Sequence, residues 1–336
     1  MLGFAGAWPI VVIMNNDGQY AIQAEGLVKR FGETTALDGV DLAVSAGTVL
    51  GVLGPNGSGK TTAVRVLATL LRADAGRALV GGYDVAVKPV AVRALIGLTG
   101  QYASVDEDLT GTENLVLIGR LLELPRREAR VRARELVDRF GLADAADRAA
   151  KTYSGGMRRR LDLAASLVGR PNVLFLDEPT TGLDPASRNQ VQDMVRVLVA
   201  DGTSVLLTTQ YLDEADKLAD RITVLDRGRV VAAGRPDELK RRTGGQTVQV
   251  RPTSGGDLDV VAGILTELTG HVPVRDDGTG LLTAPMPDPV LLSTLVRRLD
   301  DTGITADELS LRLPSLDEVF LSLTGHTTQE PEVSRA

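Results

Sequence analysis

The sequence predicts an α/β fold, in which crossover helices join the strands of a parallel sheet, followed by a smaller α+β domain. From residue 20 to residue 235, short β-branched runs alternate with longer stretches at helical spacing, as in chains built from βαβ units. Four of the runs are dominated by apolar residues, which is typical of strands buried on both faces of a parallel sheet. These runs are TVLGVLG from Thr48, VLFLD from Val173, SVLLTT from Ser204 and RITVLD from Arg221.

The composition changes along the chain predict the domain boundaries. A block rich in Leu, Ala, Arg and Glu at residues 101–169 predicts a helical subdomain inserted into a first domain at residues 20–240. The helical segment PDELKRRTGG ends on paired glycines that suit a linker, and new strand and helix patterns then predict an α+β domain at residues 241–325. We expect residues 326–336 to fray and residues 1–19 to be an extension outside the fold, with Met14 as the true start.

Composition and charge exclude several classes of function. The 336 residues are 43% apolar, enough for about two domains of roughly 150 residues each. A formal charge of −7 argues against a nucleic-acid partner, and the absence of cysteine excludes disulfides and thiolate chemistry. The two histidines argue against a histidine-bound metal, and the apolar run WPIVVIM is shorter than the ~20 residues that span a bilayer.

The strongest motif is a glycine-rich loop that directly follows the first buried strand. It fits the pattern G-x-x-x-x-G-K-[ST], and the helical stretch AVRVLATLL follows it. Its glycines turn backbone N–H groups toward a phosphate, and the helix N-terminus adds about half a positive charge. Lys60 supplies a cation for the β and γ oxygens, and the Thr61 hydroxyl can ligate Mg²⁺. The expected nucleotide-binding residues here are Gly54, Pro55, Asn56, Gly57, Ser58, Gly59, Lys60, Thr61 and Thr62.

Two adjacent carboxylates end the second buried strand. Asp177 comes at the carboxyl end of VLFLD, where ligands bind in open α/β sheets, and Glu178 follows at once. We expect Asp177 to hold Mg²⁺ directly or through water, and Glu178 to polarise the attacking water. The pair therefore predicts hydrolysis of a nucleoside triphosphate. No NKxD motif, which would bind a guanine base, follows the loop, so the sequence argues against a GTPase.

A third motif lies between these two, where YSGGM begins at Tyr153. Here the sequence resembles the ATP-binding subunits of ABC transporters, whose signature LSGGQ precedes the acidic strand, and the resemblance covers residues 21–234. It implies a cassette with a parallel-sheet core, an antiparallel β part and the inserted helical subdomain. It also implies roles for further residues: Phe31 would stack on adenine, Gln101 would sense the metal and the membrane partner, Ser154, Gly155 and Gly156 would form the signature, and Asp184 would be the D-loop aspartate.

The signature also has a physical interpretation of its own. Ser154 is a good N-cap, the two glycines expose backbone donors, and LDLAASL predicts that an amphipathic helix continues from them. One chain would thus contain two phosphate-binding sites. The resemblance implies that the signature of one subunit closes over the ATP held by the glycine-rich loop of a second copy, in a head-to-tail dimer.

One departure from the family concerns catalysis. The family commonly has His at the position of Gln210, where it contacts the γ-phosphate, and Gln cannot be protonated near neutral pH. We therefore assign water activation to Glu178, with Gln210 and Lys60 as the other catalytic residues. The metal site would consist of Thr61, Gln101 and Asp177, and the cofactors would be ATP and Mg²⁺, with no other metal.

The segment TTQYLDEAD, the appended domain and the closing PSLDEVFLSLTGH resemble the daunorubicin/doxorubicin resistance type of these subunits. This resemblance implies a bacterial ATPase at the cytoplasmic face of the membrane that drives a separately encoded permease exporting a hydrophobic antibiotic. Two alternatives remain open: an ABC-type ATPase acting on DNA or ribosomes, and an ATP-gated clamp that hydrolyses slowly. Two charged segments are expected to be solvated, the arginines from Arg126 to Arg134 and the acidic run Asp106 to Asp108, although the latter could face a permease helix.

Overall fold

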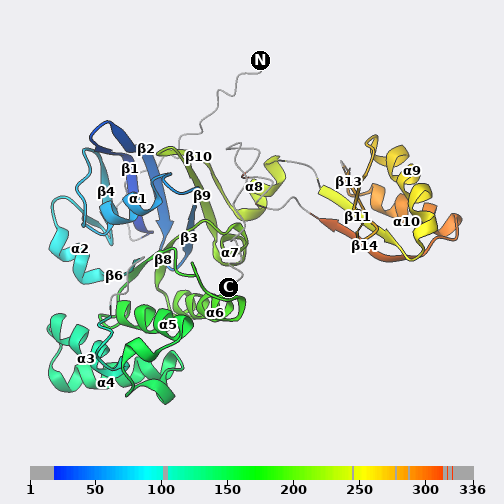
Figure 1. The fold of residues 1–336 in the computed structure, drawn as a ribbon. Coiled ribbons are helices and arrows are strands. Elements are labelled where there is room, and N and C mark those ends of the chain that lie inside the picture. The colour runs from blue at the N-terminus through cyan, green and yellow to red at the C-terminus, as the bar shows by residue number, and fades with distance from the viewer. Residues whose placement is uncertain are drawn as a thin grey trace. The chain divides into compact units, whose positions relative to one another are not determined.

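The computed structural model describes residues 19–100, 105–243, 246–276, 278–286 and 288–312, together with Leu316 and Phe320. The chain forms two compact units, Met1–Gly234 and Arg235–Ala336 (Figure 1). Across the described residues, no helix has both the length and the apolar character needed to cross a membrane.

The first unit contains an antiparallel sheet with the strand order β2-β1-β4-β5. Its strands are β1 (Tyr20–Phe31), β2 (Thr34–Ser45), β4 (Ala75–Val80) and β5 (Tyr83–Asp84). Gly32 connects β1 to β2 with a φ of +57°, a left-handed conformation that glycine adopts without strain. This sheet is the antiparallel part that the family resemblance implies.

The second sheet of this unit has the order β10-β9-β3-β8-β7-β6 and is parallel except for β10. Its strands are β3 (Val49–Leu53), β6 (Ile96–Thr99), β7 (Val173–Asp177), β8 (Ser204–Thr209), β9 (Arg221–Asp226) and β10 (Arg229–Gly234). The four apolar runs are β3, β7, β8 and β9, so the predicted parallel sheet is confirmed. Every residue of β3, β7 and β8 is buried, as expected for strands covered on both faces.

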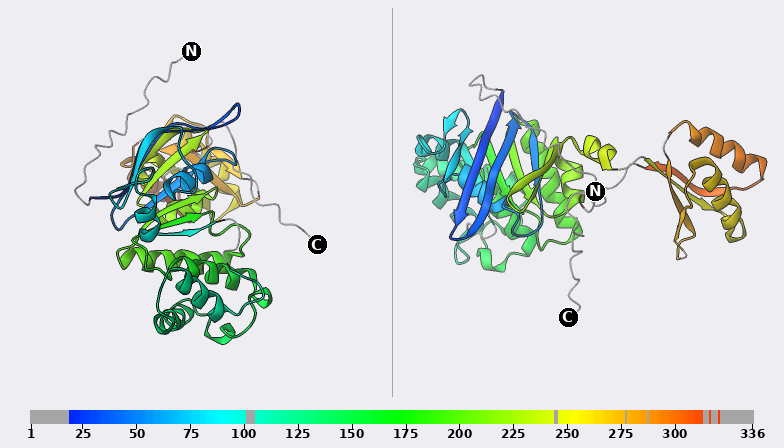
Figure 2. Two further views of the ribbon diagram at one scale, coloured as in Figure 1. Left: turned by 90° about the vertical axis from the view of Figure 1, so that its left-hand side faces the viewer. Right: turned by 90° about the horizontal axis from the view of Figure 1, so that it is seen from above.

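A separate group of helices lies at one side of the unit, below the two sheets in the view of Figure 1 (Figures 1 and 2). That group is the helical subdomain, made of α3 (Gly111–Leu121), α4 (Arg126–Arg139), η1 (Ala143–Ala145), η2 (Ala150–Thr152) and α5 (Gly155–Ser166). The other helices of the unit are α1 (Lys60–Leu67), α2 (Pro89–Leu95), α6 (Pro185–Ala200) and α7 (Leu212–Leu218). The expected amphipathic character of α5 is wrong for its second half, because Leu161 to Ala165 are all buried.

One apolar core joins the two sheets and holds α1 between them. Ile22 and Leu42 of the antiparallel sheet pack in the same cluster as Val52 and Phe175 of the parallel sheet, and Val64 of α1 belongs to it. All five side chains are at most 1% exposed. Because α1 is enclosed in this way, its N-terminus and the glycine-rich loop before it have a fixed position.

The second unit follows a β-α-β-β-α-β order, the split βαβ arrangement. After α8 (Pro236–Thr243) its elements are β11 (Gln246–Pro252), η3 (Gly255–Asp257), α9 (Leu258–Thr269), β12 (Val274–Asp276), β13 (Leu281–Met286), α10 (Leu291–Asp301) and β14 (Ala306–Arg312). The strands form an antiparallel sheet in the order β12-β13-β11-β14. Alternate residues of β11, such as Val248 and Val250, pack with Leu265 of α9 and Leu295 of α10, so both helices cover the same face.

Candidate nucleotide-binding site

The glycine-rich loop connects the end of β3 to the start of α1, and its glycines are required by the backbone path. A Cβ atom at Gly54 would lie 2.3 Å from the Leu225 carbonyl oxygen, and one at Gly59 would lie 2.5 Å from the Ala36 carbonyl oxygen. Gly59 also has a φ of +109°. A side chain at either position would therefore push the loop off the two strands beneath it.

Lys60 is the first residue of α1 and its side chain is only 4% exposed. Its ammonium group donates hydrogen bonds to the carbonyl oxygens of Gly54 at 2.7 Å and Pro55 at 3.1 Å. It also forms an ion pair with Glu178 Oε1 at 3.5 Å. Burial lowers the pKa of Lys60, and the neighbouring carboxylates of Glu178 and Asp177 partly oppose that change. A phosphate that entered the loop would meet a cation already inside it.

Asp177 is fixed at the end of β7 by two hydroxyl groups. Thr208 Oγ1 of β8 donates to Asp177 Oδ1 at 2.5 Å, and Thr61 Oγ1 of α1 donates to the same oxygen at 3.2 Å. The structure thus brings together Thr61 and Asp177, two of the residues expected at the metal site. Carboxylate and hydroxyl oxygens are hard ligands of the kind that Mg²⁺ prefers, so these residues fit that ion.

Such a site would hold Mg²⁺ with few protein ligands. Among the described residues, no group of three or more His, Cys, Asp or Glu side chains could hold a metal ion. Mg²⁺ commonly keeps waters and substrate phosphates among its ligands, so a bound nucleotide would complete the coordination by Thr61 and Asp177. The Ser58 hydroxyl of the glycine-rich loop is buried and has no hydrogen-bond partner in the part of the chain that the structure describes.

Glu178 occupies a left-handed turn directly after β7. Its φ is +50°, which is uncommon for a residue other than glycine and costs about 1–2 kcal/mol. Its amide donates to Thr208 O at 3.0 Å and lies 3.1 Å from Thr208 Oγ1. The turn directs the carboxylate toward Lys60 of the glycine-rich loop, as the ion pair shows, while Asp177 keeps a different set of partners.

A buried carboxyl group lies behind this turn on α7. Glu214 is 0% exposed and accepts a hydrogen bond from Thr180 Oγ1 at 3.1 Å. Burial raises its pKa, while hydrogen bonds to Thr209 and Thr180 oppose that rise. Gln210, which follows Thr209 at the end of β8, is partly exposed at the same edge of the sheet. Thr180 and Glu214 therefore link the segment after Glu178 to the segment that contains Gln210.

The signature begins α5 as the sequence predicts. Ser154 is the N-cap, and its hydroxyl accepts a hydrogen bond from the Met157 amide at 3.2 Å. Ser154 and Gly155 are exposed, and a Cβ atom on Gly155 would meet nothing within 4 Å. Tyr153, which replaces the family's leucine, is buried and donates its hydroxyl to Ala145 O at 2.7 Å. The substitution thus anchors the loop before the exposed helix end.

Asp184 lies beside the signature within the same chain. It caps α6, accepting from the Ser187 amide at 2.9 Å and from the Ser187 hydroxyl at 2.6 Å. A Cβ atom on Gly156 would lie 2.5 Å from that hydroxyl oxygen. The N-termini of α5 and α6 are therefore in contact, and Asp184 has a capping role that its sequence context alone did not predict.

Phe31 and Gln101 are the remaining residues expected at the site. Phe31 ends β1 and is 48% exposed, and Lys29 Nζ lies over its ring, 5.5 Å from the centroid. Its stacking on adenine stays a prediction. Gln101 lies outside the described residues, and its expected role stays a prediction.

The charged segments form contacts within the chain. Asp108 pairs with Lys151 at 2.9 Å, and Glu107 pairs with Arg158 at 2.9 Å. On α4, Ala129, Ala133, Leu136 and Val137 are buried, while most of the arginines are exposed. The expected solvated helix face is confirmed, and the acidic run binds basic residues beside the signature.

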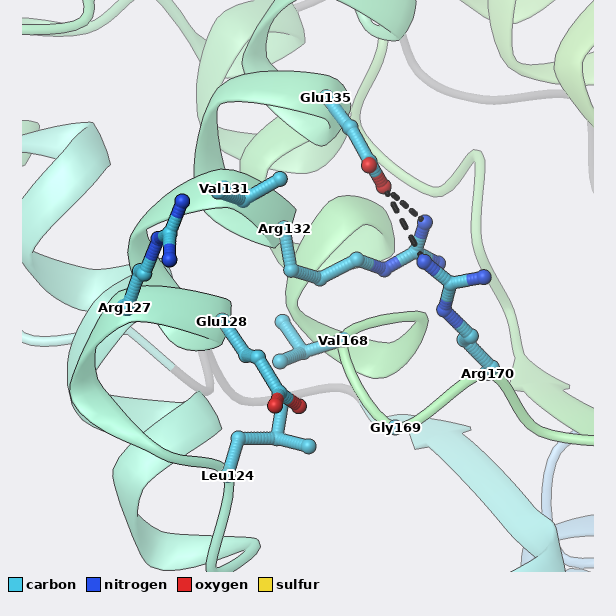
Figure 3. A pocket seen from close by; sticks show the side chains of 9 residues that line it. All are labelled: Leu124, Arg127, Glu128, Val131, Arg132, Glu135, Val168, Gly169 and Arg170. Carbon is cyan, nitrogen blue, oxygen red and sulfur yellow. Dashed lines mark hydrogen bonds and ion pairs between the residues drawn. The ribbon is translucent and has the colours of Figure 1, made fainter.

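A cavity of about 350 Å³ lies in the helical subdomain, away from the site described above (Figure 3). Figure 3 shows Arg132 of α4 and Arg170 both reaching Glu135, while Val131 and Val168 form apolar parts of the wall. None of its lining residues belongs to the glycine-rich loop, β7 or the signature, so it is not the nucleotide site.

Arg159, Thr208 and Glu214 are residues of the site region that sequence patterns did not reveal. Arg159 of α5 donates to the carbonyl oxygens of Gly100, Glu178 and Pro179. In the sequence it is the middle of three consecutive arginines, and nothing in the local pattern distinguishes it from the arginines on either side. Thr208 could have been found, because it lies near the carboxyl end of an apolar strand expected in the same parallel sheet as VLFLD.

Solved structures with the same architecture define the class of protein. The ATP-binding subunit of an ABC transporter superimposes with a TM-score of 0.60 and 26% identity, covering 66% of this chain and 92% of that chain. An ATP-binding cassette of an ABC transporter in its ADP conformation gives a TM-score of 0.58 and 29% identity, with coverage of 65% and 92%. The fold is that of an ATP-hydrolysing cassette of the ABC type.

Sequence comparisons then identify the family. The ABC transporter family matches residues 37–181, and the C-terminal domain of DrrA1-3-like ATP-binding proteins matches residues 234–324. The chain is 56% identical to the daunorubicin resistance ATP-binding protein DrrA2 of Streptomyces coeruleorubidus, over 94% of this chain and 99% of that protein. It is 46% identical to the doxorubicin resistance ATP-binding protein DrrA of Mycobacterium tuberculosis, over 94% and 97%. The chain belongs to the DrrA-like ATP-binding proteins of the ABC transporter family.

Proposed function

We propose that this chain is the ATPase subunit of an exporter whose permease is a separate membrane protein, and that the exported compound is an anthracycline-like or other hydrophobic antibiotic. Relatives named for daunorubicin, doxorubicin and linearmycin resistance support a drug as the cargo. The subunit would act at the cytoplasmic face of a bacterial membrane, as a peripheral partner of the permease.

One observation supports a mechanism in which two copies of the chain share each ATP. The chain has two separate places suited to a phosphate, the glycine-rich loop and the N-terminus of α5. The glycine-rich loop lies beside Asp177 and Glu178, whereas the exposed end of α5 presents Ser154 and Gly155 to solvent. Within the described residues, Ser154 forms its hydrogen bond with its own helix and none with the loop. A second copy can therefore place its signature over the nucleotide, which gives a head-to-tail dimer with two ATP molecules.

Each residue of the first of these places has a distinct role in this proposal. The N–H groups of the loop and Lys60 bind the phosphates. Lys60 then donates its hydrogen bonds to phosphate oxygens in place of the carbonyl oxygens of Gly54 and Pro55. Thr61 and Asp177 would hold Mg²⁺, which would supply positive charge to neutralise the negative charge that develops on the phosphates. Glu178, which the turn holds in place, accepts a proton from the attacking water. Gln210 donates a hydrogen bond to the γ-phosphate.

The test combines drug efflux with ATP turnover. The chain is expressed with a candidate permease in a drug-sensitive host, and retention of a fluorescent anthracycline is measured. Export should require both proteins and should be lost in the Glu178→Gln variant. That variant should also hydrolyse ATP about 10²–10⁴ times more slowly while still binding it.

The outcomes separate the remaining functions. Normal hydrolysis by Glu178→Gln would contradict the role of Glu178. Negligible turnover by the natural chain, with tight ATP binding, would favour an ATP-gated clamp. Efflux that does not depend on the chain would contradict the export function even if ATP is hydrolysed.

A further inference from the structure

Arg159 of α5 reaches across to the turn that holds Glu178. Its Nε donates to Pro179 O at 2.5 Å, its Nη2 to Glu178 O at 3.2 Å, and its Nη1 to Gly100 O at 3.1 Å. Each of the three nitrogens thus has its own main-chain acceptor. A guanidinium group suits this arrangement because its donors lie in one rigid plane.

The Glu178 turn needs support from both sides. Its φ of +50° is unfavourable for a side chain with a Cβ atom, so the turn persists only while its surroundings hold it. The amide side is held by Thr208 of β8. The carbonyl side is held by Arg159, which binds Glu178 O and the next carbonyl, Pro179 O.

We propose that Arg159 is a positioning residue for Glu178: it fixes the backbone of the turn and thereby the place of the carboxylate that activates water. The inference rests on the proposed function, because it assumes that role for Glu178. Arg159 belongs to the helix that begins with the signature and also holds Gly100, the last described residue before Gln101. Burial lowers the pKa of Arg159, but the nearby carboxylates of Asp162, Glu214 and Asp177 oppose that change.

Arg160 provides a matched control on the same helix. Its Nη1 donates to the carbonyl oxygens of Phe140 and Gly141, each at 3.1 Å, and both acceptors follow the end of α4. These bonds are of the same kind as those of Arg159, guanidinium to main-chain carbonyl, but none of them reaches Gly100 or the Glu178 turn. A general effect of removing an arginine from α5 should appear at both positions.

The experiment measures steady-state ATP hydrolysis for Arg159→Lys and Arg160→Lys in the full chain. Rates are expressed per nucleotide-binding site, so that a fraction that fails to fold does not count. Arg159→Lys should lower kcat about tenfold or more and leave KM for ATP within about twofold, because a small displacement of a catalytic group lowers the rate steeply. Arg160→Lys should leave both values within about twofold.

Two further measurements separate positioning from a structural role. In the Glu178→Gln background, Arg159→Lys should cause no further loss, since the group it positions is already absent. In Arg159→Ala, millimolar guanidinium should restore part of the lost kcat, whereas it should not affect Arg160→Ala.

The inference is overturned if Arg159→Lys keeps kcat within twofold, or if its loss adds fully to that of Glu178→Gln. The proposed function fails separately. If Glu178→Gln itself hydrolyses ATP normally, the assigned role of Glu178 is wrong; if it is slow while Arg159→Lys is normal, only the positioning role is wrong.

Discussion

At the scale of single residues, the site separates two adjacent carboxylates by their partners. Asp177 accepts hydrogen bonds from Thr61 and Thr208, which leaves it suited to a metal. Glu178 turns away and pairs with Lys60. The sequence shows that the two are neighbours, but the left-handed turn that divides their roles depends on Thr208 and Arg159, which approach from distant parts of the chain.

Gln210 makes a testable difference to the pH dependence of catalysis. Glutamine does not titrate near neutral pH, so kcat should show no step near pH ~6.5 that depends on this position. The Gln210→His variant should acquire such a step, because the ring can gain a proton there. Measuring kcat between about pH 5.5 and pH 8.5 tests this. Full turnover by Gln210→Ala would remove Gln210 from the site.

The buried Glu214 predicts how stability depends on pH. Burial raises its pKa in the folded chain above 4.5, so in that range the folded state binds more protons than the unfolded state. Its contribution to the free energy of unfolding is fully present below pH 4.5 and is lost as the pH rises through the folded-state pKa. Thermal unfolding of Glu214→Gln should therefore depend less on pH than that of the natural chain. Equal pH dependence in both proteins would contradict the prediction.

At the scale of elements, the two signature glycines should differ in what they contribute. A methyl group on Gly155 meets nothing, whereas one on Gly156 would lie 2.5 Å from the Ser187 hydroxyl that binds Asp184. Gly156→Ala should lower the free energy of unfolding by about 1–3 kcal/mol through overpacking between α5 and α6.

Gly155→Ala is its control. This variant should keep the stability of the natural chain but lose ATPase activity, because its methyl group occupies the surface that would face the partner's nucleotide. Chemical denaturation and steady-state hydrolysis measure the two effects. Equal stability of both variants would show that α5 and α6 do not pack as described.

The elements also show how far sequence patterns reach. Apolar runs mark β3, β7, β8 and β9 because a buried parallel strand has a distinctive composition. The long strands β1 and β2 are not uniformly apolar, and their pairing is interrupted by bulges. The antiparallel sheet that they form was therefore expected only from the family resemblance. The burial of α5 was likewise missed, since Asp162 and the arginines suggest a solvated face while packing encloses Leu161 to Ala165.

At the scale of the whole molecule, the proposed function places the motifs for binding and sealing a nucleotide in one chain and would require two chains for them to act together. The glycine-rich loop, Asp177 and Glu178 could be recognised from spacing alone, because phosphate binding imposes a strict local geometry. Arg159 and Glu214 could not, because their importance arises from contacts between segments far apart in the sequence.

The dimer can be tested with two substitutions that treat the isolated chain alike. Asp and Asn both replace Ser well as N-caps, so Ser154→Asp and Ser154→Asn should each preserve α5. In the Glu178→Gln background, ATP and Mg²⁺ should convert the natural signature and the Asn variant to dimers in light scattering. The Asp variant should stay monomeric, because its carboxylate would face the γ-phosphate held by the other copy. If the Asp variant dimerises as well as the Asn variant, the signature does not close over a partner's nucleotide, and the two phosphate-binding ends of this chain work independently.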